Sequence, residues 1–410
     1  MIERIIISSL IFLALDAYVF KALLPYAQML NNPARWISML AYWLISVGAI
    51  AFLFYGMSIF RQTRNESHIA QYALALFFVF FIPKIAIALF HLVDDLFNLA
   101  GTTFTKLSSG DTDWSRRRFI TQTGLGIGAL LFGGALYGVT KGKFRWRVLS
   151  HDIPSKILPK AFDGFKVVQI SDAHLGSFLR NYRPIEYMVE MINDLEPDLI
   201  LFTGDMVNEH AQEAKGWEQV LGRLKAKHGK YSVYGNHDYG HYGPWDEAEA
   251  LQSQLMLKEI QNEMGFQMLE NENVTIEKDG ETVKLLGVHN WGKSPHFPKI
   301  GDLDEALTGV SDNEFSILMS HDPTHFEEKI MGKVPIDLTL SGHTHGMQMG
   351  IEIPALGIKY SPIKHLYKRW GGLYDEQGQF LHVNRGMGVL GFPGRIGMWP
   401  EISLLTLRSA

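Results

Sequence analysis

Five small polar clusters in the C-terminal two thirds of the chain carry the residue types that bind metal ions. Each directly follows a short apolar run, and together they contain Asp172, His174, Asp205, Asn236, His237, His321, His343 and His345. Carboxylate, imidazole and amide oxygen are ligands for divalent ions such as Mn, Fe and Zn. The sequence therefore predicts a metal site built from these clusters.

The spacing of the clusters indicates that they meet at one place. Asp172 and His174 are two residues apart, so an extended chain turns both side chains to the same face. The first three clusters recur at intervals of about 30 residues, the length of one βα unit. An α/β sheet places its ligand site beyond the carboxyl ends of its strands. One cluster alone would be a turn or a surface histidine, but five in series favour a shared site.

The ligand types and their number fit two divalent ions, with Asp205 in the middle of the series as the natural bridge. Two ions about 3.5–4 Å apart can stabilise the attacking and leaving oxygens of an in-line displacement, and a shared water loses its proton readily. The chain has no Cys, which excludes thiolate metal sites and cysteine nucleophiles. These features predict hydrolysis of a phosphoester or pyrophosphate bond by attack of a metal-bridging hydroxide.

Alternating apolar runs and amphipathic segments predict the elements that position this site. Strands are expected at 166–170, 198–202, 230–234, 274–277, 283–288, 315–319, 338–340, 380–383 and 402–407, with helices at 184–195, 212–226 and 245–264. Residues 148–164 fit an entry loop or an edge strand. This order predicts a layered α/β fold with a largely buried sheet.

The N-terminal third has a different composition. Residues 36–60 carry no charge and are long enough to cross a bilayer, and residues 5–24, 69–93 and 119–140 are further candidate spans. Asp16 and Lys84 interrupt two of them. We expect an all-α transmembrane region of about four spans at 1–140, a linker at 141–164 and a second domain at 165–410. The mean hydropathy of +0.00 then averages two unlike parts.

Basic residues around the fourth span bear on its orientation. The run Arg116, Arg117 and Arg118 directly precedes it, similar to a twin-arginine export signal or a positive-inside stop. Either interpretation leaves the run in the cytoplasm and the second domain outside it. Four basic residues follow the span and favour the reverse: Lys141, Lys143, Arg145 and Arg147. The expectation is an integral protein of a bacterial-type inner or plasma membrane with an extracytoplasmic catalytic domain.

The set DxH, GD, GNHD, H and GHTH resembles that of the calcineurin-like metallophosphoesterases, over roughly residues 165–407. The resemblance implies a metallophosphoesterase-type β-sandwich flanked by helices, and two metal ions, Mn²⁺ in first place with Fe or Zn as alternatives. It implies one ion held by Asp172, His174, Asp205 and His345, and the other by Asp205, Asn236, His321 and His343. His237 would be the catalytic residue, stabilising the transition state or protonating the leaving oxygen. Some relatives orient this histidine with an Asp, where this chain has Asn208.

Membrane spans followed by this domain are similar to the membrane-linked branch that includes UDP-2,3-diacylglucosamine pyrophosphatase-like enzymes. The resemblance implies a phosphorylated small-molecule or lipid substrate. Arg385 or Arg395 would then meet a substrate phosphate, or be a surface charge.

Two other functions remain open at this point. One is an inactive, metal-bound module that binds a phosphorylated ligand or a partner, and the other is a helical transporter or sensor with an accessory esterase. A nucleic-acid substrate is not expected, because the net charge is −5 and no basic groove is apparent.

Overall fold

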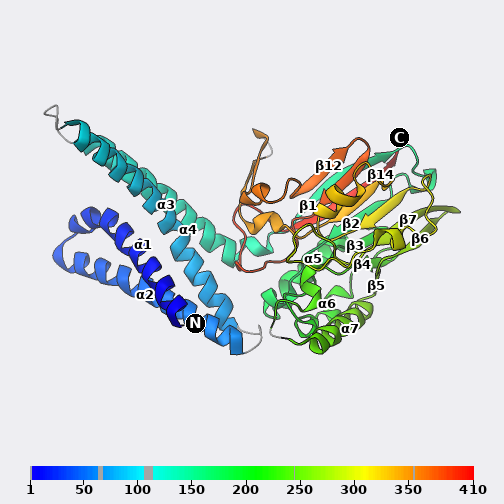
Figure 1. The fold of residues 1–410 in the computed structure, drawn as a ribbon, viewed down its shortest axis with the longest axis horizontal. Coiled ribbons are helices and arrows are strands. Elements are labelled where there is room, and N and C mark those ends of the chain that lie inside the picture. The colour runs from blue at the N-terminus through cyan, green and yellow to red at the C-terminus, as the bar shows by residue number, and fades with distance from the viewer. Residues whose placement is uncertain (1, 63–67, 106–113, 244, 354–355) are drawn as a thin grey trace. The chain divides into compact units, whose positions relative to one another are not determined.

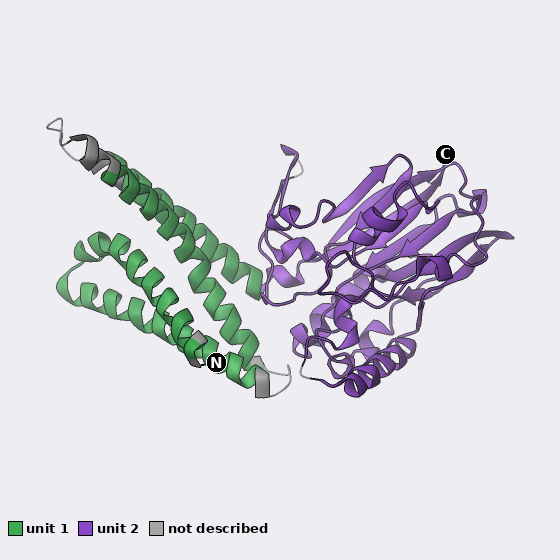
Figure 2. Ribbon diagram, in the orientation of Figure 1, with its two compact units in different colours: residues 1–63, 67–140 green, residues 64–66, 141–410 purple. Residues whose placement is uncertain are grey.

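The computed structural model describes residues 2–62, 68–105, 114–243, 245–353 and 356–410. The chain divides into two compact units, one that ends at Thr140 and one that begins at Lys141 (Figure 2). Part of the basic segment before the fourth span, residues 106–113, lies outside the described residues.

The first unit consists of long helices. They are α1 (Ile2–Gln28), α2 (Asn32–Gln62), α3 (His68–Thr105) and α4 (Trp114–Thr140). Each contains a stretch long and apolar enough to cross a membrane, namely Ile5–Gln28, Asn32–Phe60, Ile69–Leu99 and Arg118–Thr140. The predicted all-α region with four apolar helices is confirmed.

A buried polar cluster joins three of these helices. Lys84 Nζ lies 2.5 Å from Asp16 Oδ1 and 2.7 Å from the Ser46 hydroxyl oxygen. The Tyr42 hydroxyl donates to the Asp16 carbonyl oxygen at 2.8 Å. A lone charge at the centre of a bilayer is costly. The two charged residues that interrupt the apolar runs therefore pair with each other inside the bundle.

The second unit is a sandwich of two six-stranded sheets (Figure 1). The first sheet has the order β1 (Arg147–Ser155), β14 (Glu401–Ser409), β2 (Lys166–Ile170), β3 (Leu199–Phe202), β4 (Lys230–Ser232) and β5 (Phe266–Met268). The second has the order β12 (Gly372–Glu376), β13 (Gln379–Val383), β9 (Leu338–Ser341), β8 (Ser316–Met319), β7 (Glu281–Gly287) and β6 (Glu272–Lys278). A separate pair, β10 (Ile351–Ile353) and β11 (Ile358–Tyr360), forms a small hairpin.

Alternation along the central strands explains the layers. Val167 and Leu201 point between the sheets, into a core shared with Ile317 of the opposite sheet. Val168 and Phe202 point to the other side, into a core with the helices α5 (Tyr182–Asn193), α6 (Glu218–Leu221) and α7 (Glu247–Glu263). Strands buried on both faces read as continuous apolar runs. The predicted β-sandwich flanked by helices is confirmed.

One segment differs from its sequence-based prediction, and in another the structure decides between two predicted alternatives. The helix expected at 212–226 is wrong, because Gly216 has φ +89° and breaks the segment into a short 3₁₀ turn (Ala211–Ala214) and α6. The segment expected as a linker at 141–164 contains β1, an edge strand of the first sheet, which agrees with the edge-strand interpretation of residues 148–164; it runs parallel to β14 and pairs Arg147 with Glu401. That strand is held because nine backbone positions find partners at the edge of the first sheet.

Candidate metal centre

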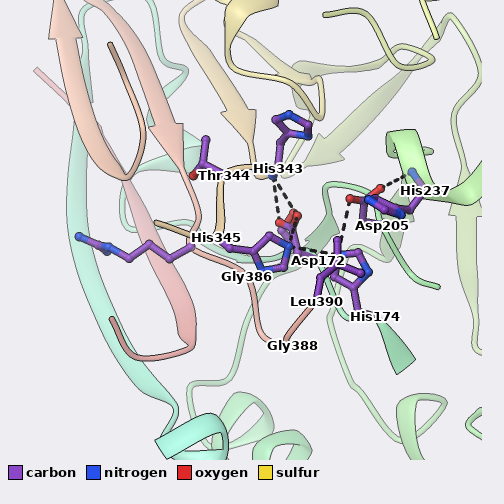
Figure 3. Close-up of polar contacts among 12 residues, drawn as sticks. Asp172, His174, Asp205, His237, His343, Thr344, His345, Gly386, Gly388 and Leu390 are labelled. Atoms are coloured by element: carbon purple, nitrogen blue, oxygen red, sulfur yellow. Dashed lines mark hydrogen bonds and ion pairs between the residues drawn. The ribbon is translucent and has the colours of Figure 1, made fainter. Parts of the chain in front are cut away.

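The predicted site residues follow the carboxyl ends of five strands. Asp172 and His174 follow β2, Asp205 follows β3, Asn236 and His237 follow β4, His321 follows β8, and His343 and His345 follow β9. In the first sheet, β2, β3 and β4 run parallel to one another. In the second, β8 and β9 run parallel to each other and to β7. The structure brings the side chains from both sheets together at this edge in two groups, and Figure 3 labels Asp172, His174, Asp205, His237, His343 and His345 among them.

The first group of ligand atoms comes from Asp172, His174 and His345, whose donor atoms all lie within 4.8 Å of one another. The Nε2 atoms of the two histidines are 3.1 Å apart, and His345 Nε2 is 3.2 Å from Asp172 Oδ1. These side chains are nearly or fully buried. Facing imidazole nitrogens beside a carboxylate form the donor set that a divalent ion requires.

The second group comes from Asp205, His321 and His343, again within 4.8 Å. His321 Nε2 lies 3.1 Å from Asp205 Oδ2, yet within the described part of the chain this buried nitrogen makes no hydrogen bond. Asn236 Oδ1 is 2.7 Å from His343 Nδ1, which adds an amide oxygen to the group.

Asp205 lies between the two groups. Its Oδ2 atom is 3.1 Å from His321 Nε2 in the second group and 3.6 Å from His174 Nε2 in the first. Its Oδ1 atom accepts the His237 backbone N–H at 2.8 Å (Figure 3). The carboxylate is thus oriented with one oxygen toward both groups, as a bridging ligand would be.

Backbone carbonyls set the tautomers of two site histidines. His174 Nδ1 donates to the Val207 carbonyl at 3.1 Å, and His321 Nδ1 donates to the Thr203 carbonyl at 2.7 Å, so both present Nε2 to the site. Such contacts fix the orientation of metal-binding histidines. Burial, followed by the neighbouring His345, holds the pKa of His174 well below its usual value, so the ring is neutral as a ligand must be.

His237 is oriented by the backbone of residue 208. Its Nδ1 atom donates to the Asn208 carbonyl oxygen at 2.6 Å. The Asn208 side chain instead accepts a hydrogen bond from the Ser177 hydroxyl. A main-chain carbonyl therefore orients the His237 ring, and the departure at position 208 leaves His237 in place.

The carboxyl groups of the site have opposed environments. Burial disfavours charge on Asp172, but His345 beside it lowers the pKa of this carboxyl to about 2. Burial and then the Asp205 carboxylate raise the pKa of Asp238 to about 7, against the backbone N–H groups that it accepts. Asp172 is therefore anionic, whereas Asp238 accepts the backbone N–H groups of Asp205 and Gly235 and holds the loop.

The backbone at the site is strained. Five of the proposed ligands have positive φ, with values of 52° at Asp172, 45° at His174, 60° at Asp205, 71° at His343 and 51° at His345. This conformation raises the free energy of a non-glycine residue, and such strain is concentrated at functional sites.

Two glycines of the motifs are required by packing against the ligands. A Cβ on Gly235 would lie 2.2 Å from Asp205 Oδ1, and a Cβ on Gly342 would lie 2.3 Å from Asp172 Oδ2. Gly235 and Gly342, which have no Cβ, therefore let their loops approach the carboxylates of Asp205 and Asp172.

Three residues near the site carried no sequence signal of their own. The Tyr367 hydroxyl is 2.7 Å from His343 Nε2, the Tyr242 hydroxyl accepts from Asn236 Nδ2 at 2.9 Å, and Asp322 Oδ2 is 3.8 Å from His343 Nε2. Asp322 could have been noted as the neighbour of His321. The tyrosines belong to loops whose return to the site is visible only in three dimensions.

The two arginines considered for substrate phosphate are buried and already engaged. Arg385 pairs with Glu401 at 2.5 Å and with Glu352 at 2.8 Å. Arg395 is fully buried and donates to the carbonyls of residues 385, 386 and 388. Neither is a surface charge, and both hold the loops that follow β13.

Comparisons with known proteins agree with this architecture. Residues 165–347 match the family described as calcineurin-like phosphoesterase, and residues 3–143 match the family described as probable calcineurin-like phosphoesterase, transmembrane domain. The chain is 33% identical over 305 residues to the uncharacterized metallophosphoesterase YkuE of Bacillus subtilis, a match that covers 72% of this chain and 98% of that protein.

Two further relatives are less identical to this chain than YkuE is, and the matched part of the chain differs between them. An uncharacterized metallophosphoesterase of Helicobacter pylori is 28% identical over 89% of this chain and 87% of its own length. A transmembrane protein with metallophosphoesterase domain from Danio rerio is 28% identical over 67% of this chain, but the match spans only 60% of that protein. The resemblance to UDP-2,3-diacylglucosamine pyrophosphatase-like enzymes stays a prediction. The chain belongs to the calcineurin-like metallophosphoesterases and carries a four-helix transmembrane phosphoesterase domain ahead of its catalytic-type sandwich.

Proposed function

We propose that the sandwich hydrolyses a phosphoester or pyrophosphate bond with two divalent metal ions. Asp172, His174 and His345 would hold one ion, Asn236, His321 and His343 the other, and Asp205 would bridge them. The observation that carries the proposal is the position of Asp205 Oδ2, within 3.6 Å of a histidine nitrogen from each group.

The protein's own residues have distinct tasks in this reaction. Bound divalent ions would supply positive charge for the phosphoryl oxygens and a water of lowered pKa. Asp205 and the histidines set where the phosphoryl group lies. His237, with Nδ1 held by the Asn208 carbonyl, presents Nε2 and in its protonated form donates that proton to the leaving oxygen.

The membrane region supports a substrate at the bilayer. Four apolar helices precede the sandwich, so a lipid phosphate or a phosphorylated molecule close to the membrane is the favoured substrate class. We place the sandwich outside the cytoplasm of a bacterial-type cell, because the arginine run before α4 favours a cytoplasmic start for that span. Protease added to spheroplasts should then digest the sandwich, whereas a sandwich that is cut only after lysis would place it in the cytoplasm.

The direct test is turnover by purified full-length protein in detergent. Wild type loaded with Mn²⁺, Fe²⁺ or Zn²⁺ is offered a generic phosphodiester, phospholipid phosphates and a lipid-linked pyrophosphate. His237→Ala should lower kcat by at least about 100-fold, in the range expected for an acid–base residue, and Asp205→Asn should lower it because the bridging ligand is weakened. His228→Ala is the matched control, since His228 lies before β4 at the strand end opposite the site.

The outcomes separate the proposal from its rival. Turnover that depends on Asp205 and His237 supports it. Metal-loaded wild type that binds phosphorylated compounds without cleaving any of them would instead favour the inactive binding module.

A further inference from the structure

The hairpin β10–β11 leaves the metal centre and returns to it. It starts six residues after His345, and Figure 1 shows it in orange, projecting from the two large sheets. After β11 the chain comes back, because the Ser361 hydroxyl donates to the Gly346 carbonyl at 2.8 Å and the Tyr367 hydroxyl reaches His343. The excursion is therefore anchored at both ends to loops that carry proposed ligands.

The hairpin has its apolar face on the outside. Its register pairs Ile351 with Tyr360 and Ile353 with Ile358, and side chains of directly paired residues share a face. These four side chains are 55%, 40%, 40% and 43% exposed in the order 351, 360, 353 and 358. Leu356, near the tip, is 69% exposed. Water therefore meets a continuous row of large apolar groups.

The opposite face of the hairpin is polar and packs on the sandwich. Glu352 and Lys359 are paired with each other in the register. Glu352 Oε1 accepts from Arg385 at 2.8 Å, while Lys359 Nζ donates to the Gly371 carbonyl and lies 4.9 Å from the centre of the Trp370 ring. The polar groups thus fix the hairpin so that its apolar face cannot turn inward.

A bilayer is the partner whose chemistry fits this face. Only six residues, 141–146, separate the end of α4 from β1, so the tether spans at most about 20 Å when fully extended. Lys364, 4.7 Å from the Tyr360 ring centre, is exposed beside the apolar row, and Lys368 is exposed four residues further along the chain. Basic residues at a membrane surface gain about 1 kcal/mol each from anionic lipid. An apolar row flanked by lysines on a membrane-tethered unit matches the boundary between acyl chains and anionic headgroups.

We propose that the outer face of β10–β11, with Leu356, inserts into the headgroup region of the membrane to which the chain is anchored, so that amphiphilic phosphoesters pass from the bilayer to the metal centre. The substrate class rests on the proposed function, while the insertion itself does not. The hairpin is then a membrane-docking element next to the metal centre.

Insertion can be measured without any turnover, because the chain has no Cys and one introduced thiol is unique. Leu356→Cys carries an environment-sensitive fluorophore in full-length protein reconstituted into vesicles of phosphatidylcholine and phosphatidylglycerol. Glu277→Cys on the exposed edge strand β6 is the matched control. Lipids with a quencher on the acyl chain should quench the probe at 356 at least about twofold more than the probe at 277.

Two results of this measurement would overturn the insertion. One is equal quenching at both positions. The other is efficient cross-linking of two Leu356→Cys chains through their introduced thiols in dilute vesicles, which would assign the face to a second copy.

The substrate part is tested by comparing lipid and soluble substrates. Ile353→Asp combined with Ile358→Asp should lower the ratio of turnover on a vesicle-borne lipid phosphate to turnover on a soluble phosphodiester by about tenfold, whereas Ile353→Leu with Ile358→Leu should keep the ratio. An equal loss on both substrates would make the hairpin only structural. A protein that inserts but cleaves nothing would refute the proposed function, and one that cleaves both substrates without insertion would refute only this inference.

Discussion

Asp238 holds the loop that carries Asp205, and its replacement by Asn tests how the metal centre is built. The carboxylate is buried and accepts four backbone N–H groups. Oδ2 accepts those of Asp205 and Gly235 at 2.8 Å each, and Oδ1 accepts those of Met206 and Val207 at 2.8 and 3.3 Å. Asp238→Asn keeps the shape of the side chain but turns one acceptor oxygen into an NH₂ donor.

The cost follows from the number of donors left unpaired. Two buried N–H groups would face the new amide, and each one costs about 1–3 kcal/mol, so the unit should lose about 2–6 kcal/mol. For a domain of this size that loss lowers the melting temperature by at least about 5 °C. The metal affinity should also fall, because the same loop provides Asp205 itself and the Val207 carbonyl that orients His174.

The assay is thermal unfolding of full-length protein in detergent, followed by tryptophan fluorescence, together with titration of Mn²⁺. Asp246→Asn is the control, since Asp246 is the exposed N-cap of α7 and Asn caps a helix equally well. The control should melt like the wild type. If Asp238→Asn also melts within about 1 °C of the wild type and binds Mn²⁺ as tightly, the loop does not depend on this carboxylate and the reasoning fails.

Three further changes probe the surroundings of the site. Tyr367→Phe removes the hydroxyl beside His343 Nε2 and should raise the Kd for Mn²⁺ by about 10–100-fold in calorimetry, without a change in melting temperature; an unchanged Kd would mean that Tyr367 does not orient the ligand. Burial lowers the pKa of His382 to about 4. The contribution of neutral His382 to the free energy of unfolding is therefore complete above pH 6.5, and about 3 kcal/mol of it is lost as the pH falls toward 4. His382→Gln should flatten this part of the pH dependence of the melting temperature. A parallel pH dependence in the two proteins would contradict the assignment. Removal of metal with a chelator should lower the melting temperature, and Mn²⁺ at about 100 times its Kd should restore about 2.7 kcal/mol, whereas identical melting with and without metal would argue against a site within the sandwich.

Sequence reasoning reached the parts of this protein that are encoded locally. The long apolar runs predicted the four apolar helices, and the run KVVQI predicted β2 residue for residue. The clusters after the strands predicted which side chains would meet, because parallel strands bring their carboxyl ends to one edge whatever the loops do. The structure gathers all eight of these residues, and their catalytic and ligand roles stay predictions.

The rest depends on contacts between distant segments. Residues 148–164 fitted an entry loop or an edge strand equally well, and the pairing of β1 with β14, more than 250 residues later, decides for the edge strand. Gly216 ended the helix expected at 212–226 through its left-handed φ, which a single sequence does not reveal. Tyr367 contacts His343 only because the chain returns to the site after β10–β11. Arg385 is buried because it forms ion pairs with Glu401 and Glu352, which are distant in the sequence.

The central claim is that two ions share the Asp205 carboxylate, and electron paramagnetic resonance of Mn²⁺-loaded full-length protein tests it most directly. At two equivalents of Mn²⁺ per chain we expect the spectrum of an exchange-coupled pair, and Asp205→Ala should abolish that coupling. A spectrum of isolated Mn²⁺ ions at two equivalents, or binding that saturates at one ion per chain, would contradict the account.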